Sequence, residues 1–144
     1  MTNQEADTRY ERSLTLPNDV QTVPQLAEFV EEVCETTGLD MGTAMKMNLA
    51  IEEAVVNVMN YAYPAGEEGT VTIDAKADGT TLTFVIIDNG TPFDPTAKGE
   101  VDTTLSAEER GIGGLGIHLI RQLMDSINYE RNNGRNVLTL VKKL

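Results

Sequence analysis

The sequence predicts an α+β fold in which helices cover one face of a largely antiparallel sheet, giving a two-layer sandwich. Two observations support this class. Segments that alternate with a period of two are joined as hairpins at Asp78-Gly79 and Asn133-Gly134, dipeptides that favour tight antiparallel turns. Segments with helical periodicity separate them, so the expected order is strand, helix, helix, hairpin, loop, helix, hairpin. Helices packed on one face of the sheet bury the apolar sides of both layers.

Size, composition and charge bound the class of protein. At 144 residues the chain is long enough to bury a core, and we expect one domain over residues 1–144, with residues 1–9 polar and flexible. The formal net charge of −12 argues against nucleic acid or an anionic membrane as the main partner, because both attract positive surfaces. The apolar runs are too short to span a membrane and we find no signal peptide, so we expect a cytoplasmic protein.

The single cysteine, Cys34, excludes an internal disulfide and suits a reducing compartment. We expect it to be a small buried hydrophobe, because the sequence shows no base that would activate its thiol. No cluster of cysteine and histidine has the spacing of a zinc site.

The first elements are a short strand and an amphipathic helix. Tyr10 to Leu16 alternates as a strand does. Thr22 and Gln25 have the spacing of a capping box at a helix start, and Gly38 suits the helix exit. Between them, apolar residues recur at helical spacing: Leu26, Phe29, Val30 and Val33.

A long central helix is expected from Met41 to the residue before Pro64, with Asp40 capping its start. One apolar stripe along it comprises Ala44, Met47, Ile51, Val55, Val58 and Ala62. A second apolar sector comprises Met45, Leu49, Val56 and Met59. With two such sectors the helix is expected to be mostly buried. The remaining side carries a narrow polar strip of Lys46, Glu53, Asn57 and Asn60.

The rest of the chain predicts two hairpins around a long loop. Strands are expected at Thr70–Ala77 and Thr80–Ile87, with Asp88 on the same helix-covered face as the apolar residues of the second strand. Asn89 to Gly113 breaks all periodicity, and a loop of this length inside a compact domain is usually functional or disordered. Leucines at helical spacing then predict a helix through Leu115, Leu119 and Leu123. Ser126–Arg131 and Asn136–Lys143 form the last hairpin.

Two polar motifs are ambiguous when each is taken alone. Glu53 and Asn57 lie side by side at i and i+4, where a carboxylate suits a general base and an amide oxygen suits Mg²⁺. This spacing by itself favours an ordinary helix-surface pair. Asp88 and Gly90 follow a buried strand, so Asp88 needs a donor, which is either a purine amino group or the backbone of its own turn.

A glycine cluster opens the helix that follows the long loop, with glycines at 111, 113, 114 and 116. Glycines let backbone N–H groups approach phosphates, and a helix N-terminus favours anions. The cluster follows a loop rather than a strand, so it is not a dinucleotide fingerprint. A flexible hinge without a ligand is the weaker alternative.

The order of these three motifs resembles the GHKL ATP-binding fold, and the resemblance covers about Tyr10 to Leu144. Within that superfamily the chain is most similar to stand-alone anti-sigma-factor serine/threonine kinases, because Asp88 to Pro95 reads DNGTPFDP. The resemblance implies binding of ATP and Mg²⁺. Glu53 matches the general base, Asn57 the Mg²⁺-binding residue and Asp88 the acceptor for the adenine amino group. Gly90 gives the base room.

The resemblance also assigns the loop and the glycines. Residues from about Thr96 to Gly111 match an ATP lid, in which Arg110 is placed to meet the γ-phosphate. The phosphate-binding glycines match Gly111, Gly113, Gly114 and Gly116. Two positions depart from related branches: Pro92 stands where others carry a second glycine, and Tyr61 where many carry histidine. The sole histidine, His118, lies inside the glycine-led helix, which argues against a histidine kinase.

Two functions remain open from the sequence. In one, the chain is a kinase that phosphorylates an anti-anti-sigma partner of the STAS type in a bacterial partner-switching system, with a sigma factor as a second partner. In the other, it is a nucleotide-dependent binding module with little or no phosphotransfer. Glu53 favours the kinase. The resemblance allows a homodimer.

Overall fold

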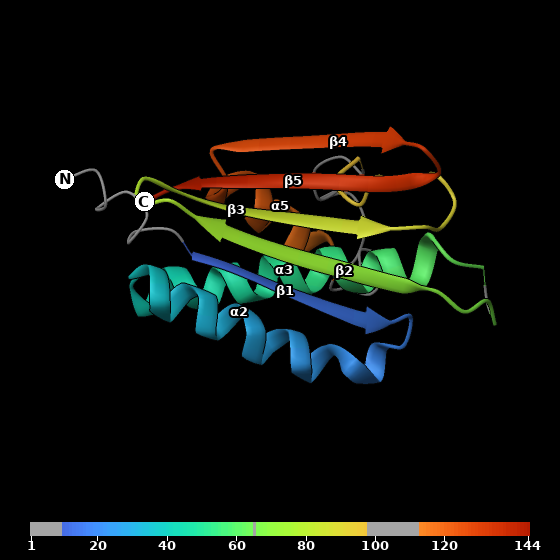
Figure 1. Ribbon diagram of the computed structural model, residues 1–144, viewed down its shortest axis with the longest axis horizontal. Coiled ribbons are helices and arrows are strands. Elements are labelled where there is room, and N and C mark those ends of the chain that lie inside the picture. The colour runs from blue at the N-terminus through green and yellow to red at the C-terminus, as the bar shows by residue number, and fades with distance from the viewer. Residues whose placement is uncertain (1–9, 65, 98–112) are drawn as a thin grey trace.

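The computed structural model describes residues 10–64, 66–97 and 113–144, and these form one sheet covered on one face by helices (Figure 1). Within these ranges the sheet has five strands in the order β1-β2-β3-β5-β4, and all neighbours are antiparallel. The strands are β1 Tyr10–Pro17, β2 Thr70–Ala77, β3 Thr81–Asp88, β4 Ser126–Asn132 and β5 Arg135–Lys143. The α+β class predicted from the sequence is confirmed.

Three α-helices form the second layer: α2 Val23–Thr37, α3 Met41–Tyr61 and α5 Gly113–Leu123. α3 packs against both α2 and α5, so it is the middle helix of the layer. The core lies between the helices and the sheet and includes Leu26, Met47, Ile51, Ile73, Phe84, Ile120 and Leu140. None of the helices in the described ranges is long and apolar enough to cross a membrane.

β3 shows how the alternation of the sequence becomes a buried face. Leu82, Phe84, Ile86 and Asp88 are buried under the helices, while the residues between them are half exposed on the open side of the sheet. Asp88 therefore lies on the helix-covered face, as predicted.

Cys34 is also buried, and burial raises the pKa of its thiol to about 11, which keeps it protonated and unreactive at neutral pH.

The helix starts depend on aspartates. Asp40 caps α3 as predicted, because its carboxylate accepts the N–H of Thr43 at 2.6 Å. The predicted capping box at Thr22 is wrong: its side chain makes no cap hydrogen bond and instead donates to the carbonyl of Asp19 at 2.6 Å. Asp19 caps a short 3₁₀ turn, η1 Val20–Thr22, that precedes α2 and takes over this role. Gly38 ends α2 in the left-handed conformation, as expected.

Both hairpins form, and they turn differently. Asn133 and Gly134 both have positive φ, 54° and 78°, which suits the predicted two-residue turn. In the first hairpin Ala77 pairs with Leu82, so β3 begins at Thr81, one residue later than predicted. The turn is centred on Gly79, with φ of 94°, and Thr80. Asp78 stabilises it by accepting the N–H groups of Thr80 and Thr81, each at 2.9 Å.

The prediction that α3 is mostly buried is wrong for part of its second apolar sector. Met45 is 64% exposed and Leu49 is 54% exposed, and Met41 on the preceding turn is 80% exposed. Met59 from the same sector is buried. The reason is the two-layer architecture: α3 has the sheet beneath it and one helix on each side, so its outer side faces solvent. α3 ends at Tyr61, earlier than Tyr63, the residue before Pro64.

Candidate nucleotide-binding site

Asp88 ends β3 as a buried carboxylate, with 2% of its surface exposed. Its Oδ1 atom accepts two hydrogen bonds, from the backbone N–H of Gly90 and from the amide Nδ2 of Asn136, both at 2.8 Å. Its Oδ2 atom accepts no hydrogen bond from any residue that the structure describes. One oxygen therefore takes both hydrogen bonds, and the other has no donor among the described residues.

Burial raises the pKa of Asp88, whereas the hydrogen bonds from Asn136 and Gly90 and the positive charge of Arg131 lower it. Of the two sequence-based alternatives, the turn backbone is confirmed, because the N–H of Gly90 donates to Oδ1. A ligand donor to Asp88 stays a prediction.

Asn136 was not identified as a site residue from the sequence. It is 2% exposed, lies on β5 and is the direct cross-strand partner of Asp88. A signal was present: Asn136 precedes Leu138 and Leu140 at a period of two, which makes it a polar residue on a buried face. A buried amide needs partners. What the sequence did not provide was the register that places this amide beside Asp88.

The turn after Asp88 packs against the end of α3. A Cβ atom on Gly90 would lie 2.4 Å from the carbonyl oxygen of Ala62, so this position admits only glycine without a backbone shift. Thr91 donates its N–H to the same carbonyl at 2.7 Å and its hydroxyl at 3.0 Å. Close contact with α3 thus explains Gly90, in addition to the room for a base implied by the family resemblance.

Tyr63 and Tyr61 anchor the same corner. The Tyr63 hydroxyl donates to the carbonyl of Thr70 at 2.6 Å and accepts the N–H of Asn89 at 3.0 Å, so it joins the end of α3 to β2 and β3. Tyr61, at one of the two positions that depart from relatives, is 58% exposed and its ring centroid lies 5.8 Å from that of Phe93. Its ring packs beside that of Phe93 in the turn that follows Asp88.

Glu53 and Asn57 lie one helical turn apart on α3, and both are half buried. Burial raises the pKa of Glu53, a hydrogen bond with Asn57 lowers it, and the neighbouring charge of Glu52 raises it. A carboxylate with a raised pKa is a better proton acceptor near neutral pH. Its role as a base stays a prediction.

Geometry orders these residues along α3. The Gly90 turn contacts Ala62; Asn57 lies five residues before Ala62 and Glu53 nine residues before it. At about 1.5 Å rise per residue, Asn57 is roughly 7 Å and Glu53 roughly 13 Å from that contact along the helix axis. A nucleotide with its base at Asp88 and its phosphates along α3 would meet Asn57 before Glu53.

The donor set suits Mg²⁺ that arrives with a nucleotide. The described ranges contain no group of three or more His, Cys, Asp or Glu side chains able to hold a metal ion on their own. Mg²⁺ bound to nucleotide phosphates takes only one or two protein ligands and keeps several waters. The amide oxygen of Asn57 fits that requirement.

Part of the predicted phosphate site lies outside the described residues. This applies to residues 98–111 of the predicted lid, which include Arg110 and Gly111. Gly113, Gly114 and Gly116 lie in the first turn of α5, which packs against α3. At the base of the predicted lid, Thr96 is buried: Asp94 accepts its N–H at 2.8 Å and its hydroxyl at 2.7 Å, and Arg121 of α5 donates to its carbonyl.

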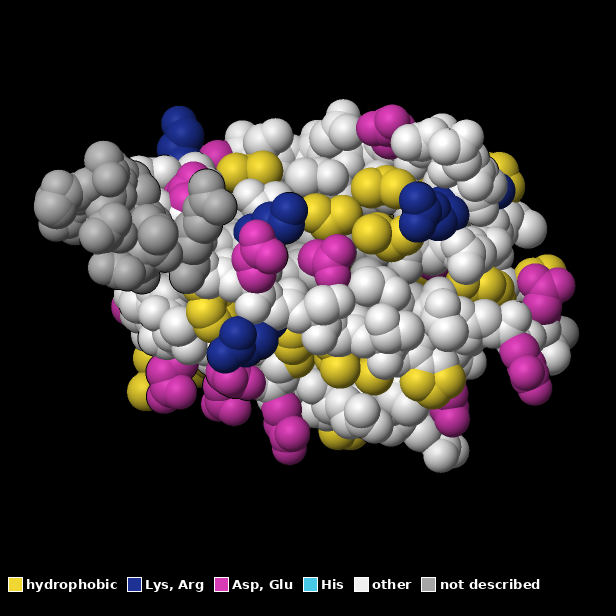
Figure 2. Space-filling view, in the orientation of Figure 1, with side chains coloured by type: hydrophobic (Ala, Val, Ile, Leu, Met, Phe, Trp, Pro, Cys, Tyr) yellow, Lys and Arg dark blue, Asp and Glu magenta, His cyan; other side chains and the backbone are white. Residues whose placement is uncertain are grey.

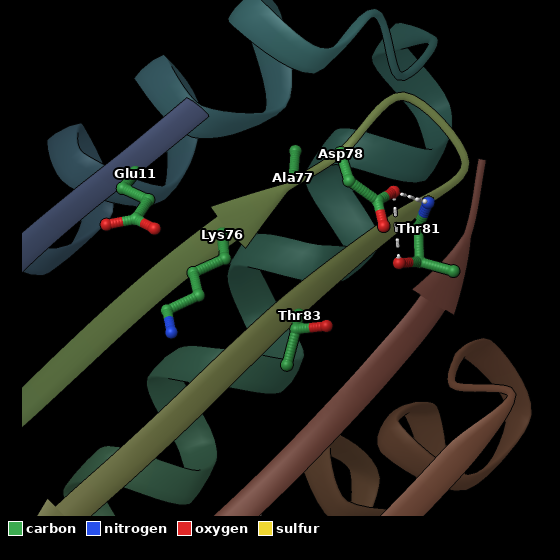
Figure 3. A pocket seen from close by; sticks show the side chains of 6 residues that line it. All are labelled: Glu11, Lys76, Ala77, Asp78, Thr81 and Thr83. Atoms are coloured by element: carbon green, nitrogen blue, oxygen red, sulfur yellow. Dashed lines mark hydrogen bonds between the residues drawn. The ribbon is translucent and has the colours of Figure 1, made fainter. Parts of the chain in front are cut away.

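A separate hollow of about 350 Å³ lies on the open face of the sheet (Figure 3). Its polar lining includes Glu11, Lys76, Asp78, Thr81 and Thr83. Thr81 begins β3 and Asp88 ends it, so the hollow and Asp88 lie at opposite ends of that strand and on opposite faces of the sheet. We therefore treat it as distinct from the candidate site.

The fold and this site define the class of protein. A largely antiparallel sheet under three helices, with a buried aspartate at the end of a central strand and a glycine-led helix, is the arrangement of the GHKL-type fold. In agreement, the family described as the histidine kinase-like ATPase domain matches residues 16–142. The chain belongs to this family.

Characterised relatives are named as protein kinases. The serine-protein kinase RsbW of Listeria monocytogenes is 31% identical over 110 residues, covering 74% of this chain and 70% of that protein. RsbW of Halalkalibacterium halodurans is 30% identical over 134 residues, covering 85% and 81%. The serine/threonine-protein kinase BtrW of Bordetella bronchiseptica is 29% identical over 94 residues, covering 65% of this chain and 66% of that protein, just under two thirds.

Proposed function

We propose that this chain is an ATP-dependent protein serine/threonine kinase of the anti-sigma-factor type. Its substrate is an anti-anti-sigma partner of the STAS type, and a sigma factor is its second partner. The observation that carries the proposal is Asp88: a buried carboxylate with Oδ1 held by the fold and no donor to Oδ2 among the described residues. The names of the serine-protein kinase relatives support the same activity.

The mechanism assigns one task to each residue. ATP is the source of the γ-phosphoryl group, and Mg²⁺, when bound, would neutralise charge that develops on the phosphates. Asp88 binds the adenine amino group through Oδ2, and Asn57 would hold Mg²⁺ through its amide oxygen. Glu53 accepts the proton of the partner's serine or threonine hydroxyl as its oxygen bonds to the γ-phosphorus, and ADP leaves.

The remaining predicted residues bind phosphate. Gly113, Gly114 and Gly116 place backbone N–H groups at the start of α5, where a helix terminus favours anions. The family resemblance assigns phosphate binding also to Gly111 and Arg110, which lie outside the described residues. We propose that residues 1–144 act as one domain.

The test compares Glu53→Gln with wild type in a phosphotransfer assay that uses labelled ATP and a purified STAS-type partner. Gln keeps the shape of Glu and loses its basicity, so phosphate transfer is expected to fall by roughly 10²–10⁴-fold while ATP affinity stays near wild type. Glu31→Gln, at an exposed glutamate of α2, is the matched control and should transfer phosphate normally.

Two outcomes would contradict the proposal. If Glu53→Gln transfers phosphate as fast as wild type, Glu53 is not the base. If wild type phosphorylates no partner and yet binds one only when nucleotide is present, the chain is a nucleotide-dependent binding module.

A further inference from the structure

The side-chain amide of Asn136 is held in one orientation. Its Oδ1 accepts the backbone N–H of Phe93 at 3.1 Å, a guanidinium N–H of Arg131 at 3.2 Å and the hydroxyl of Tyr129. Its Nδ2 donates to Asp88 Oδ1 and to the carbonyl of Thr91, both at 2.8 Å. A flipped amide would point its oxygen at a carboxylate and a carbonyl, and its NH₂ at donors.

Two side chains of the neighbouring strand β4 help to hold the amide of Asn136 in this orientation. β4 provides Tyr129 and Arg131, and Arg131 also donates to the carbonyl of Gly90 at 2.8 Å. Asn136 therefore connects the last hairpin to the whole turn from Asp88 to Phe93. The NH₂ group of Asn136 and the N–H of Gly90 both donate to Asp88 Oδ1, and no described residue donates to Oδ2.

We propose that Asn136 is a positioning residue for base recognition: it occupies one oxygen of Asp88 so that the other presents a pure acceptor to the 6-amino group of adenine. This inference rests on the proposed function. An acceptor at that point accepts a hydrogen bond from the amino group of ATP and repels the 6-oxo group of ITP or GTP. Asn136 would thereby determine nucleotide specificity without touching the nucleotide.

The groups that surround Asp88 explain why the donor from Asn136 matters. Among the described residues, β2 offers apolar Val71 opposite Asp88, β4 offers the cation of Arg131, and the segment after α3 offers the neutral phenol of Tyr63. Burial raises the pKa of Asp88, and the amide of Asn136 is the largest influence that lowers it. Without that amide the carboxyl binds a proton more readily, and a protonated carboxyl can donate to a 6-oxo group.

The experiment measures ATP and ITP affinities by calorimetry for wild type, Asn136→Leu and Asn136→Thr. Wild type is expected to prefer ATP. Asn136→Leu, which has no donor, should lose roughly ten- to a hundredfold in ATP affinity and much less in ITP affinity, so the preference collapses. The loss should be larger at low pH and should shrink as the pH rises, because Asp88 ionises again. Asn136→Thr returns a hydroxyl donor and should restore much of the preference.

Tyr129→Phe is the matched control. It removes a partner of Asn136 Oδ1 and leaves the donor to Asp88 in place, so the ATP-to-ITP ratio should stay near wild type. A purely structural role for Asn136 predicts instead that ATP and ITP affinities fall together in Asn136→Leu, without pH dependence, and that result would overturn the inference.

Two further results separate the possible failures. If Asn136→Leu does not fold, Asn136→Ala also removes the donor and does so without adding bulk to the strand. Its ATP-to-ITP ratio should also collapse, and an unchanged ratio contradicts the inference. If wild type binds no ATP, the proposed function fails; if it binds ATP with a preference that no Asn136 variant alters, the positioning role alone fails.

Discussion

Asp88 is a carboxyl group buried in the core, with 2% of its surface exposed. Burial raises its pKa above the ordinary value of 3.8, and its hydrogen bonds and Arg131 only partly offset this. A carboxyl with a higher pKa in the folded state binds its proton more tightly when folded. Its contribution to stability is present below about pH 3.8 and is lost as the pH rises through the folded-state pKa.

At the residue scale, Asp88→Asn is expected to separate stability from binding. The amide oxygen can accept both hydrogen bonds that Oδ1 accepts, and no charge is buried. The free energy of unfolding should therefore exceed that of wild type at pH 7, with a gap that narrows as the pH approaches 3.8. ATP affinity should fall roughly ten- to a hundredfold.

Urea denaturation across this pH range, together with calorimetry for ATP, measures both effects. A variant that is less stable than wild type at every pH would mean that the buried charge is stabilised by its partners more than it is penalised by burial. ATP affinity equal to that of wild type would remove Asp88 from the site.

At the scale of elements, α3 has three sides that differ in burial and in chemistry. Its inner face is core, where Met47 is fully buried, and its flank presents Glu53 and Asn57. Its outer face is apolar and exposed, although methionine and leucine there look no different in sequence from those inside. Hydrophobicity would predict that these side chains are buried. They are exposed because no further layer of the fold covers the outer face of α3.

The matched pair Met47→Ala and Met45→Ala tests this assignment of faces. Met47→Ala removes a fully buried side chain and should cost about 2–5 kcal/mol of unfolding free energy. Met45, at 64% exposure, should change stability by no more than about 0.5 kcal/mol. Both values come from urea denaturation. Similar losses at the two positions would mean that the outer face of α3 is covered in solution.

Comparison of elements shows which features the sequence could predict. Strands, helices and hairpins followed from local chemistry: Asp40 caps α3 and Asn133-Gly134 turns the last hairpin, as predicted. Asp88 and its burial followed from alternation along one strand. Asn136 and the exposed methionines did not, because they depend on strand register and on which faces meet, contacts between residues far apart in the chain.

At the scale of the whole molecule, charge is unevenly distributed. α2 carries Glu28, Glu31, Glu32 and Glu35 and no basic residue, and all four glutamates are exposed. Figure 2 shows acidic side chains gathered along the margin of the molecule over this helix. With a net charge of −12, the folded chain concentrates like charges that the unfolded chain spreads out.

This charge predicts that salt stabilises the protein. The Debye length is about 30 Å at 0.01 M salt and about 8 Å at 0.15 M, so added salt screens repulsion across the molecule. The urea midpoint at pH 7 should therefore rise with NaCl over this range, and choline chloride should act as well as NaCl because general screening needs no specific cation. The effect should fade as the pH approaches the isoelectric point of about 4.3, where the net charge vanishes. A midpoint that falls with salt at pH 7 would mean that attractive charge pairs outweigh the repulsion, and a rise with NaCl alone would indicate a bound sodium ion.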